Sequence, residues 1–417
     1  MSGTDVVIVG AGAAGLSLAH WLTEQAPPAP LSTPLSTPPS VPLSVPLSVT
    51  LIDAPEGPLR PPDRTWCFWE EPGGPYDALL TASWDRLRVH GPDGAATTGR
   101  TTPLRYKMLR STGFGAAVGT RIAAAGVRRL TAVVDGIVDG PVGREGAEVH
   151  GTRADGSPLR LRARWVFDSR PPRVTPPART VLLQHFRGWF VRTPRPSFPP
   201  DTADLMDFRT PQPARGLSFG YVLPTGPCTA LVEYTEFSRT VLTGEGYDRA
   251  LRHYLDRVLG IDGYEVTAVE QGVIPMADTR STVRAGASVF RIGAAGGATR
   301  PSTGYTFAGV QRQARAVAAL LHAGRVPVPP PAHGPRARAM DAVLLRALDT
   351  GRVAGAPFFT RLFRTVPLPT LLRFLDGDTR PSEDFAIGLR TPVRPMLHTA
   401  LELPFVPRRA TNGRPPR

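Results

Sequence analysis

The sequence predicts an α/β fold, α+β overall, in which a parallel sheet carrying helices is joined to a second β-sheet and to C-terminal helices. Three observations predict it. A buried strand, a glycine turn and a helix open the chain, the stretch 179–275 is mainly β in pattern, and a second strand, glycine turn and helix follow at 288–322. A chain of 417 residues is long enough for two or three domains.

The first twenty residues have the pattern of a dinucleotide-binding turn. An apolar strand, Val6–Val9, precedes Gly10, Gly12 and Gly15 in G-x-G-x-x-G spacing, and a helix over Ala13–Trp21 follows. The glycines permit a tight turn, close approach of the backbone to a pyrophosphate, and close packing of helix on strand. The helix N-terminus offers N–H groups and a positive dipole end to phosphates. We expect a Rossmann-type site here; the alternative is a glycine-rich turn of another α/β fold.

A ribose-binding acid is expected at the end of the second strand, about 20 residues further on, but none lies there. A run of Pro, Leu, Ser, Thr and Val with near-repeats occupies residues 27–49 instead, and the strand Val49–Asp53 follows it. Removing this run restores the spacing. We therefore predict that Asp53 binds the ribose and that 27–49 is a surface loop insert, extended or disordered.

The net charge of +14 comes almost entirely from arginine, because Lys107 is the only lysine. Such a surface attracts nucleic acid or an anionic membrane, or is simply solvated. No nucleic-acid motif is present, so we expect no nucleic-acid partner. Cys67 and Cys228 form no C-x-x-C pair and the histidines show no ligand spacing, which favours a cytoplasmic protein without a metal site. We predict neither a signal peptide nor a membrane span.

The middle of the chain is predicted to mix strands and helices. Residues 63–69 are unusually aromatic, and Trp66 and Trp69 either pack in the core or form a flat apolar wall for a substrate. Residues 105–114 look helical, whereas 127–166 contains several short strands. One helix, at about 247–259, interrupts the later β region.

The strand–turn–helix at 288–322 could supply a second contact to a long dinucleotide such as FAD, in one domain that is discontinuous in sequence. Its candidate cofactor-binding residues are Gly293, Gly296, Gly297, Pro301, Gly304 and Tyr305.

Residues 336–376 look helical and mix apolar residues with arginine, which suits either a core face or a membrane-surface face. The predicted divisions are the N-terminal part of the dinucleotide-binding domain (1–175), a mainly β substrate domain (176–284), the C-terminal part of the dinucleotide-binding domain (285–330), a helical region that could contact a membrane (331–400) and a disordered tail (401–417).

Short motifs run in one order along most of the chain. They are the N-terminal glycines with Val49–Asp53, then Asp63–Trp69, Phe167–Pro171, Gln184–Trp189, Met206–Arg209 with Gln212, Tyr221–Pro224, Leu231–Ser238, Gly272–Met276 and Gly296–Tyr305. In these motifs the chain resembles the bacterial lycopene β-cyclase family of carotenoid synthesis. The insert at 27–49 departs from the family's pattern, but it falls in an expected loop.

The resemblance implies an FAD-dependent enzyme that acts on lycopene and other ψ-ended carotenoids. In this chemistry the terminal double bond is protonated, the neighbouring double bond attacks the cation, and loss of a proton gives a β-ring without net oxidation or reduction. The family looks to need reduced FAD, with NAD(P)H as the electron source. An anionic reduced flavin could stabilise the cation or take part in proton transfer.

The resemblance assigns the catalytic acid to Glu233, within Val232-Glu-Tyr-Thr235. A carboxyl in an apolar polyene tunnel would have a raised pKa and stay protonated, whereas a strand glutamate in water would not. Asp207 and Arg209 are second catalytic candidates, or else a structural ion pair. Trp66, Trp69 and Trp189 are the candidate substrate contacts.

A polyene substrate dissolves in membranes, so the resemblance also implies a peripheral membrane protein whose helices at 336–376 contact the bilayer. Two alternatives stay open at this point. One is an FAD-dependent monooxygenase or isoprenoid reductase acting on a membrane lipid, and the other is a non-enzymatic flavin-binding protein at the membrane. Neither the oligomeric state nor one-ended against two-ended cyclisation follows from the sequence.

Overall fold

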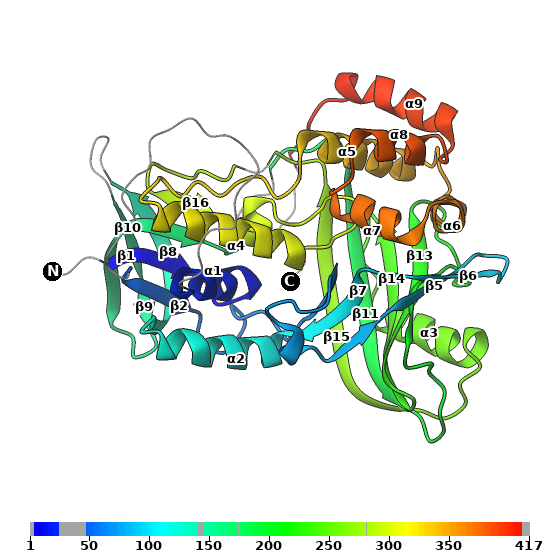
Figure 1. Cartoon of the computed structure of the whole chain (residues 1–417), viewed down its shortest axis with the longest axis horizontal. Coiled ribbons are helices and arrows are strands. Elements are labelled where there is room, and N and C mark those ends of the chain that lie inside the picture. Colours follow the sequence, from blue (N-terminus) through cyan, green and yellow to red (C-terminus); the bar gives the residue numbers. More distant parts are fainter. Residues whose placement is uncertain (1–3, 25–46, 141–145, 173–175, 281, 411–417) are drawn as a thin grey trace.

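We analysed a computed structural model, which describes residues 4–24, 47–140, 146–172, 176–280 and 282–410. Two large sheets lie at opposite ends of the molecule, and a small three-stranded sheet lies between them (Figure 1). The C-terminal helices stack on one end of the second sheet (Figure 1). None of the described helices combines the length and apolar character needed to cross a membrane.

The first sheet is the predicted parallel sheet. Its strands are β1 (Thr4–Val9), β2 (Val49–Asp53), β8 (Arg128–Asp139), β9 (Ala147–Arg153), β10 (Pro158–Asp168) and β16 (Val289–Arg291). The parallel strands lie in the order β8–β2–β1–β10–β16, and β9 pairs antiparallel with both β8 and β10. The first strand in sequence is thus central, as in dinucleotide-binding sheets, which confirms the predicted fold class.

Alternation along β1 gives this sheet two covered faces. Val6 and Ile8 pack in a core with α1 (Ala13–Thr23), α2 (Ser111–Ala124) and α4 (Phe307–His322). Val7 and Val9 point to the opposite face and pack against β9 and its neighbours. Because both faces are buried, the β1 segment reads in the sequence as an uninterrupted apolar run.

The second sheet has the order β15–β11–β14–β13–β12–β5–β6. Its strands are β15 (Glu265–Ala277), β11 (Val181–Arg192), β14 (Thr229–Ser238), β13 (Leu217–Gly226), β12 (Thr202–Asp207), β5 (Arg86–His90) and β6 (Ala96–Arg100). The described pairings are antiparallel except for β12 with β5. The outer face packs on α3 (Gly244–His253) and the π-helical turn Tyr254–Val258, where a helix over 247–259 is predicted.

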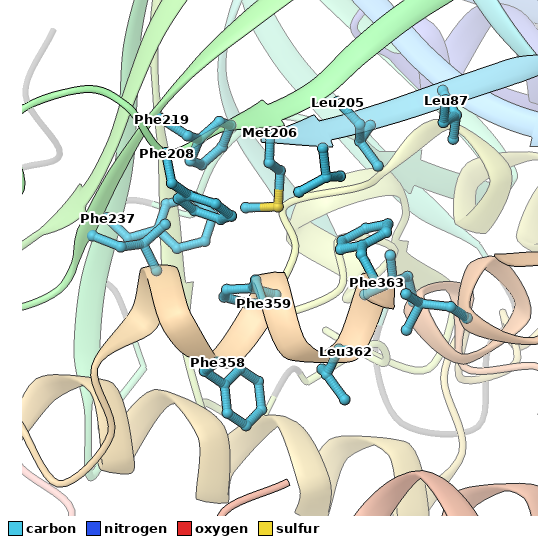
Figure 2. Close-up of a cluster of buried hydrophobic side chains, with 14 of the residues drawn as sticks. Leu87, Leu205, Met206, Phe208, Phe219, Phe237, Phe358, Phe359, Leu362 and Phe363 are labelled. Atoms are coloured by element: carbon cyan, nitrogen blue, oxygen red, sulfur yellow. The ribbon is translucent and has the colours of Figure 1, made fainter. Parts of the chain in front are cut away.

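The C-terminal helices cover the inner face of this sheet. They are α5 (Pro335–Asp349), α6 (Gly355–Thr365), α7 (Leu368–Asp376), α8 (Pro381–Gly388) and α9 (Val393–Glu402). Figure 2 shows α6 lying across the sheet, with Phe359 and Phe363 pointing toward the strands and Phe358 and Leu362 pointing away from them. All four side chains are buried. The apolar residues of 336–376 therefore serve mainly as core.

Two segments differ from the sequence-based expectation. Residues 105–114 are not one helix, because β7 (Arg105–Arg110) pairs with β3 (Thr65–Glu70) and β4 (Ala82–Trp84) before α2 begins at Ser111. Partners 22 to 45 residues away in sequence decide this, as tertiary context often overrides local pattern.

The structure describes part of the expected tail and the last residues of the expected insert. Residues 401–410, predicted to belong to a disordered tail, include a 3₁₀ turn at Leu403–Phe405 and a β-bridge from Arg409 to Ala178. The prediction was wrong for this part because backbone pairing and apolar contacts fix it. Residues 25–46, most of the predicted insert, and 411–417 lie outside the described residues.

Candidate active site

A cavity of about 330 Å³ lies between the inner face of the second sheet, strand β3 and helix α6. Most of its walls are apolar, including Phe186, Phe219, Phe237, Phe359 and Phe363. Its volume is in the range of small-molecule sites, and a few polar groups converge on it. It is therefore a space in which an apolar substrate would meet a small set of polar groups.

Glu233 borders this cavity from the centre of β14. Register places it directly between Gly188 of β11 and Tyr221 of β13. Gly188 leaves room beside it, since a Cβ there would lie 2.7 Å from a Leu231 methyl and 3.5 Å from the Glu233 Cβ. The strand thus aims the carboxyl into a space that its neighbours leave open.

Burial among apolar groups raises the pKa of Glu233 to about 8, and the nearby Glu270 carboxylate adds to the rise. The Thr235 hydroxyl opposes it by donating a 2.5 Å hydrogen bond to Glu233 Oε1. The side chain keeps some accessible surface because it borders the cavity. At neutral pH its carboxyl is therefore mainly protonated and able to donate a proton.

Glu270 was not singled out in the sequence. It lies on β15 opposite Gly188, on the same face as Glu233. Its carboxylate accepts hydrogen bonds from the Thr65 amide at 2.7 Å and the Thr65 hydroxyl at 2.5 Å. It is thereby fixed at the cavity wall, and no motif signal could have revealed this, because β3 and β15 meet only in the fold.

Three tyrosine hydroxyls gather at the same cavity. The Tyr106 hydroxyl is hydrogen-bonded to Tyr221 and lies 3.3 Å from the Tyr305 hydroxyl, and Tyr221 and Tyr305 border the cavity with Glu233. Burial raises the pKa of each of them well above that of a free tyrosine, so all three remain protonated donors. Burial likewise raises the pKa of the adjoining Cys67 to about 12, so it stays a thiol. Tyr305 was predicted as a site residue, whereas Tyr106 lies in the segment mistaken for a helix.

The N-terminal glycines form an open cradle at the start of α1. Gly10 has a φ of +97°, and a Cβ on Gly15 would lie 1.9 Å from the Gly10 carbonyl oxygen. A Cβ on Gly12 would meet nothing within 4 Å, and no side chain caps the helix there. Backbone N–H groups at this end therefore face open space, which fits the diphosphate of a dinucleotide.

The second glycine segment closes against the first. Gly293 (φ +64°) begins a 3₁₀ turn, and a Cβ there would lie 2.7 Å from the Ala14 Cβ of α1. A Cβ on Gly296 would lie 2.5 Å from the Arg291 carbonyl oxygen, and Gly297 is left-handed with a φ of +75°. The two segments, far apart in sequence, thus lie against each other in the fold.

The chain after this turn reaches the cavity. Pro301 leads into Ser302–Phe307, which forms part of the cavity wall. Gly304 has a φ of +72°, and a Cβ there would lie 2.2 Å from Gln184 Oε1. That oxygen is buried and has no hydrogen-bond partner among the described residues. An unpaired acceptor beside a backbone that tolerates close approach fits a polar flavin ring edge.

The remaining predicted residues are placed as follows. Asp53 ends β2 and forms an ion pair with Arg60. Trp66 borders the cavity, and Trp69 packs edge-on against Tyr305 with ring centroids 4.6 Å apart. Trp189 lies elsewhere. Gln184 and Phe186 face the cavity, so strand alternation turns Trp189 to the outer face, near Arg252 and Tyr264.

Asp207 and Arg209 also lie away from the cavity wall. Asp207 is fully buried and accepts hydrogen bonds from Arg209 and, at 2.9 Å, from the Tyr254 hydroxyl. This is the structural ion pair that the sequence left open as an alternative. The positions of Asp207, Arg209 and Trp189 therefore give no support to a role in catalysis or substrate contact.

Solved structures share this fold. A geranylgeranyl bacteriochlorophyll reductase-like protein from Thermoplasma acidophilum aligns over 95% of this chain and 98% of that chain, with a TM-score of 0.60 and 13% identity. A flavoprotein/dehydrogenase from Cytophaga hutchinsonii aligns over 96% of this chain and 99% of that chain, with a TM-score of 0.61 and 11% identity. A p-nitrophenol 4-monooxygenase from Pseudomonas putida aligns over 98% of this chain and 100% of that chain, with a TM-score of 0.54 and 14% identity. Identities this low show a common fold alone.

No curated protein sequence matches the chain. The family described as lycopene cyclase protein matches residues 5–401, which is nearly the whole chain and includes both glycine segments and the cavity. The protein therefore belongs to the lycopene cyclase family.

Proposed function

We propose that the protein is a lycopene β-cyclase, which closes the ψ-ends of lycopene to β-rings, through γ-carotene to β-carotene, without net redox change. The observation that carries the proposal is the protonated Glu233 carboxyl at the wall of an apolar cavity. A carboxyl that remains an acid at neutral pH is what proton-initiated ring closure needs.

In the proposed reaction the Glu233 carboxyl gives its proton to the terminal double bond of a ψ-end. The π electrons of the neighbouring double bond then form the new carbon–carbon bond, and a proton leaves the ring to give the β double bond. One proton is taken up and one released, so substrate and product are isomers. Phe219, Phe237 and Phe359 exclude water that would capture the cation, and their ring faces suit a positive charge.

The residues proposed to hold FAD are Gly10, Gly12, Gly15, Asp53, Gly293, Gly296, Gly297, Pro301, Gly304 and Tyr305. The open backbone at Gly12 and the unpaired Gln184 oxygen support this assignment. Reduced FAD, with NAD(P)H as the electron source, would supply electrostatic stabilisation of the cation or a proton-transfer group. Tyr221 and Tyr305 would orient groups at the same end of the cavity through their hydroxyls.

The protein is further proposed to work at the cytoplasmic membrane surface, because its substrate partitions into the bilayer. Its net charge of +14 supports attraction to anionic lipids. We propose no nucleic-acid partner.

The test is expression in cells that accumulate lycopene, followed by chromatography of the pigments. β-Carotene is the expected product, and γ-carotene alone would mean one-ended cyclisation. Glu233→Gln should lose most of the activity while keeping bound flavin, and Glu236→Gln, on the opposite face of β14, is the matched control. Unchanged lycopene with flavin-loaded wild-type protein would overturn the proposal. NAD(P)H consumed in step with product would instead indicate a monooxygenase or reductase.

A further inference from the structure

A second cavity, of about 410 Å³, lies among the C-terminal helices and takes no part in the proposed chemistry. Its walls are mostly apolar and come from α5, α6, α7, α8 and α9. The charged side chains in its wall are already paired. Arg300 donates to Asp341 at 3.1 Å, and Asp384 is bound by Arg336 and Thr379. The cavity therefore suits a long apolar ligand and offers little to a polar one.

The two cavities share walls. Ser302, Thr303, Phe359 and Leu375 border both of them. Helix α6 lies between, and in Figure 2 its Phe359 points toward the sheet while Phe358 and Leu362 point to the other side, where they border the second cavity. Helix α6 and the segment at Ser302 and Thr303 thus form the partition between the second cavity and the space that holds Glu233.

The other end of the second cavity opens at an exposed apolar surface. We call Phe385, Leu389, Val393, Leu397, Leu401 and Phe405 the apolar face; their exposed fractions are 70%, 57%, 45%, 57%, 65% and 87%. Val393, Leu397 and Leu401 follow one another at four-residue spacing and so lie on one side of α9. Four members, Phe385 to Leu397, also border the cavity. The cavity mouth and the apolar face are therefore continuous.

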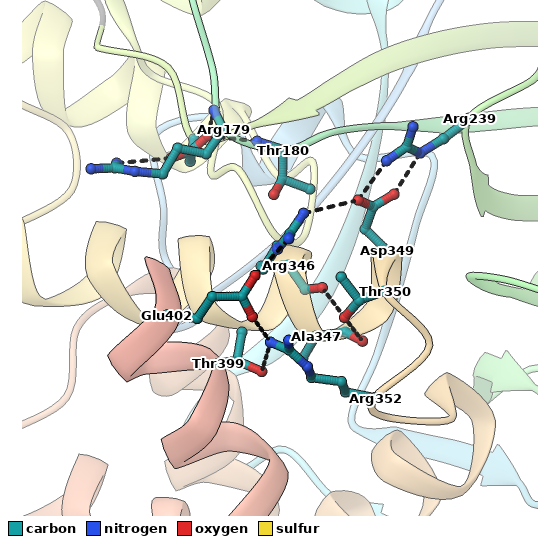
Figure 3. Close-up of polar contacts among 11 residues, drawn as sticks. Arg179, Thr180, Arg239, Arg346, Ala347, Asp349, Thr350, Arg352, Thr399 and Glu402 are labelled. Atoms are coloured by element: carbon teal, nitrogen blue, oxygen red, sulfur yellow. Dashed lines mark hydrogen bonds and ion pairs between the residues drawn. The ribbon is translucent and has the colours of Figure 1, made fainter. Parts of the chain in front are cut away.

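Helix α9 presents this face as a fixed element. Its last residue, Glu402, accepts a 2.6 Å bond from Arg346 of α5 and is paired with Arg352, as Figure 3 shows. Asp349 of α5 is bound in turn by Arg239 at 2.6 Å (Figure 3). Polar bonds satisfy the inner side, and in Figure 1 α9 is the outermost C-terminal helix. The apolar side is left facing outward.

The surroundings of the apolar face are basic. Arg390 and Arg394 lie at its centre in sequence, and neither forms an ion pair with a carboxylate among the described residues. Arg394 is exposed and lies one residue after Val393, about 100° further around α9. Exposed apolar groups bordered by unpaired arginines match the interface of an anionic bilayer. A water-soluble protein partner would not explain a cavity mouth at the centre of the same surface.

We propose that the apolar face of α8 and α9 seats on an anionic phospholipid bilayer, and that the cavity beneath it is the entrance by which a polyene reaches Glu233. The inference rests on the proposed function and moves the expected membrane contact from 336–376 to residues 385–405. The polyene would leave the acyl-chain layer through the mouth and pass α6 into the catalytic cavity. The apolar chain would then cross no layer of water.

The surface is tested by co-flotation of the full-length protein with vesicles of phosphatidylglycerol and phosphatidylcholine. Wild-type protein should float with the vesicles. Salt at 0.5 M shortens the electrostatic screening length to about 4 Å and should therefore weaken the binding. The double variant Leu401→Glu with Phe405→Glu, two exposed members of the apolar face that do not border the cavity, should bind at least about ten-fold more weakly, since it places charges in the apolar layer. Val138→Glu, at 58% exposure on β8, is the matched control and should bind like wild type.

Turnover then separates this inference from the proposed function. The double variant should lose most turnover of lycopene held in vesicles but keep turnover of lycopene in detergent micelles. Wild-type protein that is inactive in both vesicles and micelles would contradict the proposed function instead. Met396→Trp, which fills the cavity, should keep vesicle binding and lower turnover in both media. The proposed entrance would be wrong if the double variant turned over lycopene in vesicles as fast as wild type. It would also be wrong if Met396→Trp, with an unchanged Tm, kept full turnover.

Discussion

The hydroxyl of Thr235 donates a 2.5 Å hydrogen bond to Oε1 of Glu233, two residues back on the same face of β14. The bond orients a carboxyl that burial keeps protonated. It also favours the ionised form, so it limits how far the pKa of Glu233 rises. Two opposing influences on one side chain thus set the pH range in which the acid works.

The first prediction concerns activity against pH. Because burial raises the pKa of Glu233 to about 8, cyclisation should be steady near neutral pH and fall about ten-fold per unit above 8. Initial rates measured with flavin-loaded protein at fixed ionic strength would check this. A rate that keeps rising to pH 9 would show that another group gives the proton.

The second prediction is a matching change in stability. The folded pKa of Glu233 lies above that of an unfolded glutamate, so the protonated carboxyl favours the fold fully below about pH 4.5, and this contribution is lost progressively as pH rises from there to about 8. Glu233→Gln should therefore gain in Tm relative to wild type as pH rises from 5 to 8, with no further gain above 8. A constant Tm difference over that range would contradict the raised pKa.

The third prediction tests Thr235. Thr235→Val keeps the shape of the side chain but removes the donor, so the pKa of Glu233 should rise and the alkaline limb of the rate profile should move to higher pH. Thr229→Val, at the start of the same strand, is a control that leaves the bond intact. An unmoved limb would mean that Thr235 is only a packing residue.

The fourth prediction concerns the glycine cradle. A Cβ on Gly15 would lie 1.9 Å from the Gly10 carbonyl oxygen, and backbone cannot yield as a side chain does. Gly15→Ala should therefore purify with little or no flavin, measured by the visible absorbance of the oxidised ring, even if it folds. Gly113→Ala, where a Cβ meets nothing within 4 Å, should retain flavin and gain up to about 1 kcal/mol in helix stability.

The sequence could predict elements whose signal is local. The buried run of β1, the glycine spacing and the strand that ends at Asp53 need no distant information, and all three are confirmed. Glu233 was found through its motif, because the strand pattern alone does not distinguish a cavity face from a solvent face. Its position in the structure agrees with that assignment, while its role stays a prediction.

Features set by strand partners could not be predicted. Trp189 and Gln184 belong to one motif, yet alternation separates them, and which face meets the cavity depends on β14 and β15. Tyr106 belongs to a segment that pairs with two strands and so is not helical. Glu270 joins the site only because β15 lies beside β11. The sequence of α9 has an ordinary amphipathic pattern. That its apolar side is exposed can be recognised only once the side that packs on α5 is known.

The last prediction concerns the wall between the two cavities. Arg300 and Asp341 form an ion pair in which both side chains are 2% exposed, and Ser302 donates to the same carboxylate at 2.6 Å. Asp341→Ala would leave the Arg300 charge buried without its partner, which costs about 3–5 kcal/mol in unfolding free energy. It should also loosen the segment that carries Gly304, so flavin affinity should fall. The matched change is Asp376→Ala, whose partner Arg312 is 42% exposed and hydrated, so the cost should be about 1 kcal/mol or less. Denaturant unfolding and flavin titration of both variants would measure this. Equal losses of unfolding free energy in the two variants would mean that the Arg300 guanidinium finds water or another acceptor. The wall would then rearrange more easily than its burial implies.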